Sequence, residues 1–210
     1  METFTFLRKR SLSVFSKIFG IGLVCVLTFT LFIILYLIPA YRQSMLEDRK
    51  ADSRLLAATV QTVLDQALAQ VKRGELSLDT ARRNALNELQ AVRPDKNRYF
   101  WVHDLRLTML MHPFQPALVG KDLSRYRDPD GKLLFVEMNK LVLDQGNGYV
   151  DYQWPRPGTA LPVPKLSFVQ LFHPWGWVIG TGIYVDDVYQ ETAANQRVAL
   201  LISCGLALLL

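Results

Sequence analysis

The sequence has 210 residues, room for one ordinary domain plus membrane segments, and half of them are hydrophobic, with a mean hydropathy of +0.12. Its net charge of +5 and pI near 9.3 would suit nucleic-acid binding, but residues 41–195 hold 19 Lys and Arg against 18 Asp and Glu, which argues against it. Both cysteines, Cys25 and Cys204, lie in apolar end segments, which excludes disulfides and cysteine metal sites from the middle.

An uncharged apolar run covers residues 18–40. It has roughly the ~20 residues that an α-helix needs to cross a bilayer. A cleaved signal peptide is the alternative, but its apolar core typically has about 7–15 residues and ends at small residues. We therefore predict a transmembrane helix at 18–40. The preceding charges predict a cytoplasmic tail at 1–17, because four bases outnumber one acid there: Arg8, Lys9, Arg10 and Lys17 against Glu2.

The long apolar helix is expected to continue outside the membrane. From Tyr41 to Val71 apolar residues return at intervals of three and four with no proline, and Gly74 is a natural terminator. Ser77 is a suitable N-cap for a second helix. The residues at 93–97 (RPDKN) predict a turn.

After that turn the pattern predicts mainly strands. Short turns join them, so the sheet should be antiparallel, with the two earlier helices packed on one face. The fold class is therefore α+β. The predicted elements are strands at 99–102, 108–111, 149–154, 165–172 and 177–184, and a helix at 133–143.

The carboxyl end is apolar again, from residue 198 to residue 210 (VALLISCGLALLL), yet this run is too short to span a bilayer. A buried tail helix is one interpretation. We prefer the start of a second, truncated transmembrane helix at 194–210, because it mirrors the first. The central domain, 41–193, would then be tied to the bilayer at both ends, which is typical of a receptor that passes a shape change inward.

Several blocks of the central domain closely resemble one family, the single Cache sensor domain of type 2. They are Tyr99-Phe100-Trp101-Val102-x-Asp104, Met111-His112-Pro113, Leu118-x-Gly120-Lys121-Asp122-Leu123, Asp128-x-x-Gly131, Gly146-x-Gly148, Tyr152-x-Trp154-x-x-Pro157-Gly158, Lys165-x-Ser167, Pro174-Trp175-x-Trp177 and Gly180-Thr181-Gly182-x-Tyr184-x-Asp186-Asp187. The likeness covers roughly residues 41–188. One departure is the first hairpin turn, Leu105–Leu107, where similar domains often carry glycine; it leaves the shape of this turn open.

The resemblance implies a PAS-like sheet of about five strands and a periplasmic domain anchored in the inner membrane. Similar domains occur in methyl-accepting chemotaxis receptors, in some sensor histidine kinases and in cyclic-dinucleotide enzymes. Their better-known ligands are organic acids of two or three carbons, and many such receptors are homodimers. The expected function is therefore sensing of a small carboxylate, most simply in a chemoreceptor.

Three cationic side chains are candidate ligands of that carboxylate. His112 follows an apolar strand, and Lys165 opens a later one; the resemblance favours both as ligand contacts, against a core histidine and a solvated strand end. Arg93 precedes the turn into the first strand, and a surface helix-end charge is an equally good interpretation. A charge-assisted donor contributes about twice as much as a neutral one, which is why a small anion needs such groups.

Aromatic side chains are the candidate walls of the pocket. Tyr99 and Trp101 share one face of their strand, and so do Tyr152 and Trp154, because side chains alternate along a strand. Each pair could line a small pocket with a hydroxyl or indole donor, or could be ordinary core.

Other chemistry finds little support in the sequence. The three histidines, His103, His112 and His173, are far apart and lack the spacing of a metal site, and no catalytic motif or cofactor signature occurs. We therefore expect neither an enzyme nor a bound cofactor. The competing hypothesis is a membrane-anchored module that binds a periplasmic protein or a cell-wall component.

Overall fold

The structure, a computed structural model, describes residues 13–187, 189–190, 197–198, 200–203 and 205. The chain divides into two compact units, Ser44–Val188 and the chain ends at 1–43 with 189–210. Most of the predicted tail at 1–17 and of the predicted second span at 194–210 lies outside the described residues, so both assignments stay predictions.

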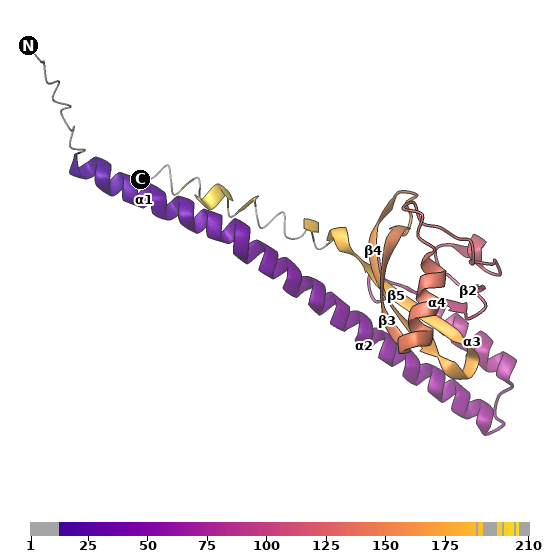
Figure 1. Cartoon of the computed structure of the whole chain (residues 1–210). Coiled ribbons are helices and arrows are strands. Elements are labelled where there is room, and N and C mark those ends of the chain that lie inside the picture. The colour runs from indigo at the N-terminus through magenta and orange to yellow at the C-terminus, as the bar shows by residue number, and fades with distance from the viewer. Residues whose placement is uncertain (1–12, 188, 191–196, 199, 204, 206–210) are drawn as a thin grey trace, which may run out of the picture. The chain divides into compact units, whose positions relative to one another are not determined.

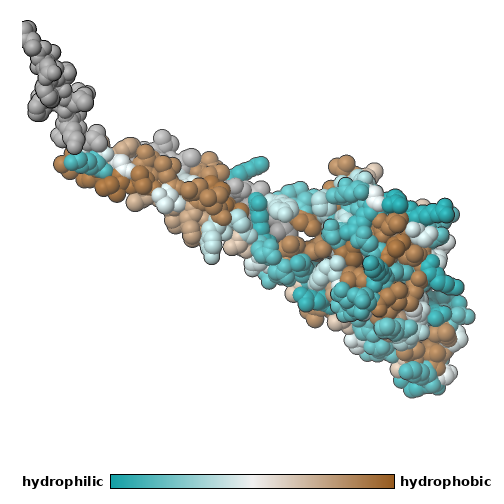
Figure 2. Space-filling view, in the orientation of Figure 1, coloured by the Kyte–Doolittle hydropathy of each residue, from teal (hydrophilic) through white to brown (hydrophobic). Residues whose placement is uncertain are grey.

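The amino-terminal helix is continuous. It comprises α1 (Val14–Phe32), a π-helical turn (Ile33–Leu37) and α2 (Ile38–Lys72). Many apolar side chains are exposed along its first part, which Figure 2 shows as a brown surface, and its most apolar window is not buried against protein. Among the described residues this is the helix whose length and composition suit a membrane crossing, as predicted for residues 18–40.

A second helix, α3 (Leu78–Ala91), pairs with the later part of α2. Ser77 caps α3, because its hydroxyl accepts a hydrogen bond from the Thr80 N–H at 3.2 Å. Gly74 ends the preceding helix with a φ of 74°, a conformation that costs glycine little. Both boundaries agree with the sequence prediction.

Five strands form one antiparallel sheet in the order β2-β1-β5-β4-β3. Figure 1 shows this sheet together with its helices. They are β1 (Phe100–Asp104), β2 (Met109–Met111), β3 (Asn147–Pro155), β4 (Pro162–Phe172) and β5 (Trp177–Tyr184). Helix α4 (Leu134–Gln145) precedes β3, and two short 3-10 turns, Pro116–Leu118 and His173–Trp175, lie in connections. The predicted α+β class and the five-stranded antiparallel sheet are thus confirmed.

Each face of the sheet carries its own apolar core. Helices α2 and α3 cover one face, as predicted, with a core that includes Leu64, Leu89, Phe100, Val102 and Ile179. Helix α4 covers the other face, over a core that includes Tyr99, Trp101, Phe135, Tyr152 and Trp154. The alternation of side chains along β1 divides its residues between the two cores.

The first hairpin turn adopts its shape without glycine. Leu107 has a φ of 63°, a left-handed conformation that costs a non-glycine residue roughly 1–2 kcal/mol. Asp104 holds the turn, because its Oδ1 accepts hydrogen bonds from the Arg106 N–H at 3.0 Å and the Thr108 N–H at 2.8 Å. The sequence left the shape of this turn open, and the hydrogen bonds to the Asp104 side chain account for it.

Two glycines of β5 make room for side chains above the sheet. A Cβ at Gly180 would overlap the indole of Trp101, and a Cβ at Gly182 would overlap the hydroxyl of Ser167. Both glycines have ordinary strand conformations, so space and not backbone freedom requires them here.

We expect Gly180→Ala to destabilise the domain far more than Gly158→Ala. The first substitution forces the Trp101 ring to move, and overpacking of this kind costs about 3 kcal/mol. The second meets open space, and its cost of about 1 kcal/mol comes from a φ of 76°. Urea unfolding of a fragment of residues 44–188 measures both; similar losses in the two variants would contradict the packing argument.

Candidate functional site

A lysine lies at the centre of the α4-covered face of the sheet. Lys165 is only 1% exposed. Its position in β4 places it directly between Tyr152 of β3 and Tyr184 of β5, which are its Cα partners on the neighbouring strands. Its Nζ donates a hydrogen bond to the Tyr99 hydroxyl at 2.9 Å.

Three aromatic rings surround the ammonium group. Lys165 Nζ lies 4.0 Å from the ring centroid of Tyr99, 5.2 Å from that of Trp101 and 5.1 Å from that of Tyr184. We call Lys165 with these three residues the aromatic cage. All three rings lie within the distance at which an aromatic face attracts a cation.

His112 extends the cage toward β3. Its ring centroid lies 5.1 Å from that of Tyr99 and 5.6 Å from that of Trp154. Its Nδ1 accepts hydrogen bonds from the N–H groups of Phe114 at 3.2 Å and Gln115 at 3.0 Å, so Nε2 carries the proton. Burial, and then the charge of Lys165, lowers the pKa of His112 to about 3. The imidazole is therefore neutral near pH 7 and offers an N–H donor.

The wall toward β3 consists of Tyr152 and Trp154. Their rings meet edge to face, with centroids 5.9 Å apart. The Tyr152 hydroxyl shares a hydrogen bond of 2.9 Å with the Ser167 hydroxyl. Burial raises the pKa of Tyr152 and of Tyr99 well above the ordinary value, so both hydroxyls stay protonated.

The electrostatics of the cage favour an anionic ligand. Among the described residues Lys165 forms no ion pair with a carboxylate, and burial alone lowers its pKa well below the ordinary value. The indole Nε1 of Trp101 is also buried, with no hydrogen-bond partner in the part of the chain that the structure describes. Both groups donate and cannot accept, so an acceptor with negative charge would satisfy them.

Six of the seven predicted ligand residues meet in this region, and one lies apart. His112, Lys165, Tyr99, Trp101, Tyr152 and Trp154 are all buried and adjacent. Arg93 is exposed; its guanidinium lies 5.1 Å from the ring centroid of Phe114, whose ring in turn packs on Tyr99. Whether each residue contacts a ligand stays a prediction.

The sequence prediction missed Tyr184 as a cage residue, although a signal for it existed. The predicted strands 165–172 and 177–184 have equal length, and a four-residue turn joins them. Counting outward from that turn pairs Lys165 with Tyr184, which is the observed register.

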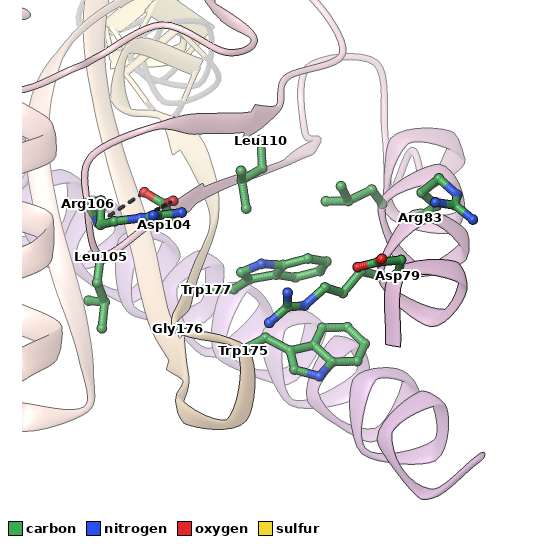
Figure 3. A pocket seen from close by; sticks show the side chains of 11 residues that line it. Asp79, Arg83, Asp104, Leu105, Arg106, Leu110, Trp175, Gly176 and Trp177 are labelled. Atoms are coloured by element: carbon green, nitrogen blue, oxygen red, sulfur yellow. Dashed lines mark hydrogen bonds and ion pairs between the residues drawn. The ribbon is translucent and has the colours of Figure 1, made fainter. Parts of the chain in front are cut away.

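A hollow of about 520 Å³ lies between α3, the β1–β2 turn and the turn before β5 (Figure 3). Its charged side chains have both signs, and Arg106 Nε already lies 3.4 Å from Asp104 Oδ2. The other lining groups include Asp79, Arg83, Trp175 and Trp177. This mixture selects no ligand charge, unlike the cage.

His103 has a structural role and does not belong to the cage. It is fully buried, and its Nε2 lies 3.0 Å from the Asn139 Oδ1 of α4. Asn139 Nδ2 donates to the Leu105 carbonyl at 3.1 Å, so the pair fastens α4 to the first hairpin. Burial lowers the pKa of His103 to about 4. No group of three or more His, Cys, Asp or Glu is placed to hold a metal ion in the part of the chain that the structure describes.

Comparisons with known proteins agree on one family. The model described as single Cache domain 2 matches residues 45–197. The methyl-accepting chemotaxis protein McpP of Pseudomonas putida is 50% identical over 137 residues, which are 65% of this chain and 25% of McpP. The sensor histidine kinase MctS of Rhizobium johnstonii is 30% identical over 161 residues, 75% of this chain and 33% of MctS. The chain thus spans a third or less of these relatives.

Solved structures show the same domain. A periplasmic sensor domain of a chemotaxis protein has 52% identity and a TM-score of 0.66, covering 67% of this chain and 98% of its own. A Cache chemosensory domain, described in connection with carboxylic acid recognition, has 40% identity and a TM-score of 0.65, covering 68% of this chain and 97% of its own.

The buried histidines make the domain sensitive to acid. His112 binds no proton in the folded state until about pH 3, whereas its unfolded form binds one below about 6.5, so stability falls as pH drops below 6.5. Asn at this position can accept the two backbone hydrogen bonds without titrating. Between pH 6 and 4.5 we expect the wild type to lose about 1.4 kcal/mol more per pH unit than His112→Asn. Urea unfolding at several pH values tests this, and parallel profiles would refute it.

Proposed function

The chain belongs to the single Cache domain 2 family, and from that premise we propose that residues 41–193 sense a small organic acid for a bacterial membrane receptor. The observation that carries the proposal is Lys165, a buried cation with no acidic partner among the described residues, inside an aromatic cage. A carboxylate of two or three carbons would supply that partner.

The bound carboxylate would meet donors on several sides. One oxygen would pair with the Lys165 ammonium, and the indole N–H of Trp101 and the Nε2–H of His112 are the nearby neutral donors. The aromatic walls exclude water, which strengthens each of these bonds. The cage groups are buried side chains in contact with one another, so a ligand that enters between them would have to be small.

The carboxylate class has independent support from a relative. The structural neighbour described in connection with carboxylic acid recognition is 40% identical to this chain over the aligned region. A ligand with one carboxylate fits better than one with two, because Lys165 is the single cation of the cage and His112 is neutral near pH 7.

We place the sensor domain in the periplasm of an inner-membrane protein. The helix at 18–40 would anchor it, and the basic residues at 8–17 would keep the amino terminus in the cytoplasm. The relative described as a periplasmic sensor domain supports this compartment. We also propose that the protein is a homodimer and that the long exposed helix α2 forms the dimer interface.

For the intact receptor we favour a chemotaxis output. McpP, a chemotaxis protein, shares 50% identity with this chain, against 30% for the sensor kinase MctS. The MctS match makes the input domain of a histidine kinase the second candidate. In either case the domain itself would bind its ligand without chemical change.

Replacing Lys165 with Met should separate binding from stability. The folded pKa of Lys165 is depressed, so its charged form costs stability at neutral pH, and an apolar replacement of similar volume should stabilise the ligand-free domain by about 2 kcal/mol. The same change should abolish ligand binding. Thermal unfolding of residues 44–188 is measured with acetate, propionate, pyruvate, lactate and glycolate.

In the wild type one acid at about 100 times its dissociation constant should stabilise the domain by about 2.7 kcal/mol, a shift of several degrees. Lys140→Met, which removes an exposed charge from α4, serves as the matched control and should keep the shift. If none of the acids shifts the wild type at millimolar concentration, the small-carboxylate proposal fails and a protein partner becomes the better hypothesis.

A further inference from the structure

One ring of the cage also contacts a second cation. Tyr184, the last residue of β5, has its ring centroid 5.1 Å from Lys165 Nζ and 4.7 Å from the guanidinium carbon of Arg156. Its hydroxyl donates a hydrogen bond to the Pro155 carbonyl at 2.8 Å. Because Tyr184 is only 2% exposed, its ring cannot shift without moving these neighbours.

Arg156 is held by two carboxylates that lie just beyond β5. One of its terminal nitrogens lies 2.7 Å from Asp186 Oδ1 and 2.6 Å from Asp187 Oδ1. Asp187 also accepts a hydrogen bond from the Asn97 side chain at 3.3 Å. The Arg156 side chain is 19% exposed, that of Asp186 26% and that of Asp187 41%, so water screens the pairing with Asp186 less than it screens a surface ion pair.

This cluster lies where the chain leaves the sheet. Residues 185–187 form a helical turn directly after Tyr184, and they precede the residues that lead to the carboxyl-terminal apolar segment. Contacts therefore run without a gap from Lys165 through the Tyr184 ring and Arg156 to Asp186 and Asp187.

We propose that Arg156 is a positioning residue that couples occupancy of the aromatic cage to the segment after β5, through the ring of Tyr184. The inference rests on the proposed function, since the occupant is a carboxylate. A carboxylate that pairs with Lys165 competes with the Tyr184 ring for the ammonium. The ring then faces Arg156 as its remaining cation, and a shift of either group moves the two aspartates that Arg156 holds.

The coupling is measured by amide hydrogen exchange in residues 182–190 of the full chain in detergent micelles. In the wild type, saturating propionate should change the exchange rate there at least about fivefold, the lower end of typical couplings. Arg156→Gln should lose this response, and Arg156→Lys, which keeps the charge, should retain most of it. Thermal shift confirms saturation of each variant.

Lys132→Gln is the matched control. Lys132 is also held by two carboxylates, Glu137 at 3.2 Å and Asp151 at 3.2 Å, and its side chain is 24% exposed, but it does not contact the cage. If ion pairs of this kind have only a structural role, both substitutions should have equal effects. An intact response in Arg156→Gln, or an equal loss in Lys132→Gln, would overturn the coupling.

A ligand-free comparison keeps the inference separate from the proposed function. Lys165→Met removes one of the two cations from the Tyr184 ring, so it should change exchange in residues 182–190 when Arg156 is present. The same substitution in the Arg156→Gln background should have no further effect there. If propionate does not bind but this difference holds, the carboxylate proposal fails while the coupling stands; if Lys165→Met acts equally in both backgrounds, the coupling fails.

Discussion

The burial of Lys165 with no acidic partner among the described residues is the constraint around which this domain is arranged. A buried ammonium is costly unless nearby groups compensate for the lost water. Here the compensation is partial: one hydroxyl and three aromatic faces. Under the proposed function, the unmet part of that cost would give the cage its affinity for an anion. Anion binding and the stability cost in the ligand-free domain would then have the same cause.

The rest of the sheet serves to hold those rings in place. Trp101 lies over Gly180 and Ser167 over Gly182, so the two missing Cβ atoms of β5 determine how closely the cage packs on the strand. Antiparallel register then aligns Tyr152, Lys165 and Tyr184 in one row. Helices α2 and α3 are confined to the opposite face, which leaves the cage to the α4 side.

Tyr184 links the cage to the end of β5. Its ring is shared by a cation inside the cage and a cation outside it, and the outer one is bound to the two aspartates that follow the strand. A sensor needs a ligand site whose two states differ in the position of a distant segment. The proposed coupling would meet that need through one shared aromatic ring at the end of the central strand.

The sequence by itself determined the α+β class, the helix caps at Gly74 and Ser77 and the succession of strands along the chain, because apolar periodicity and turn residues are local signals. Strand alternation made Tyr99 and Trp101 candidate wall residues, and the resemblance to the Cache family favoured Lys165 as a ligand contact. Tyr184 could also have been predicted from the sequence, by counting residues outward from the turn between β4 and β5. Tertiary structure alone decided that Phe114 stands between Arg93 and the cage, that Asp104 shapes the Leu107 turn, and that Lys165 lacks an acidic partner among the described residues. These three features depend on contacts between segments that are distant in the sequence. Periodicity along the chain does not indicate which side chains meet across a sheet.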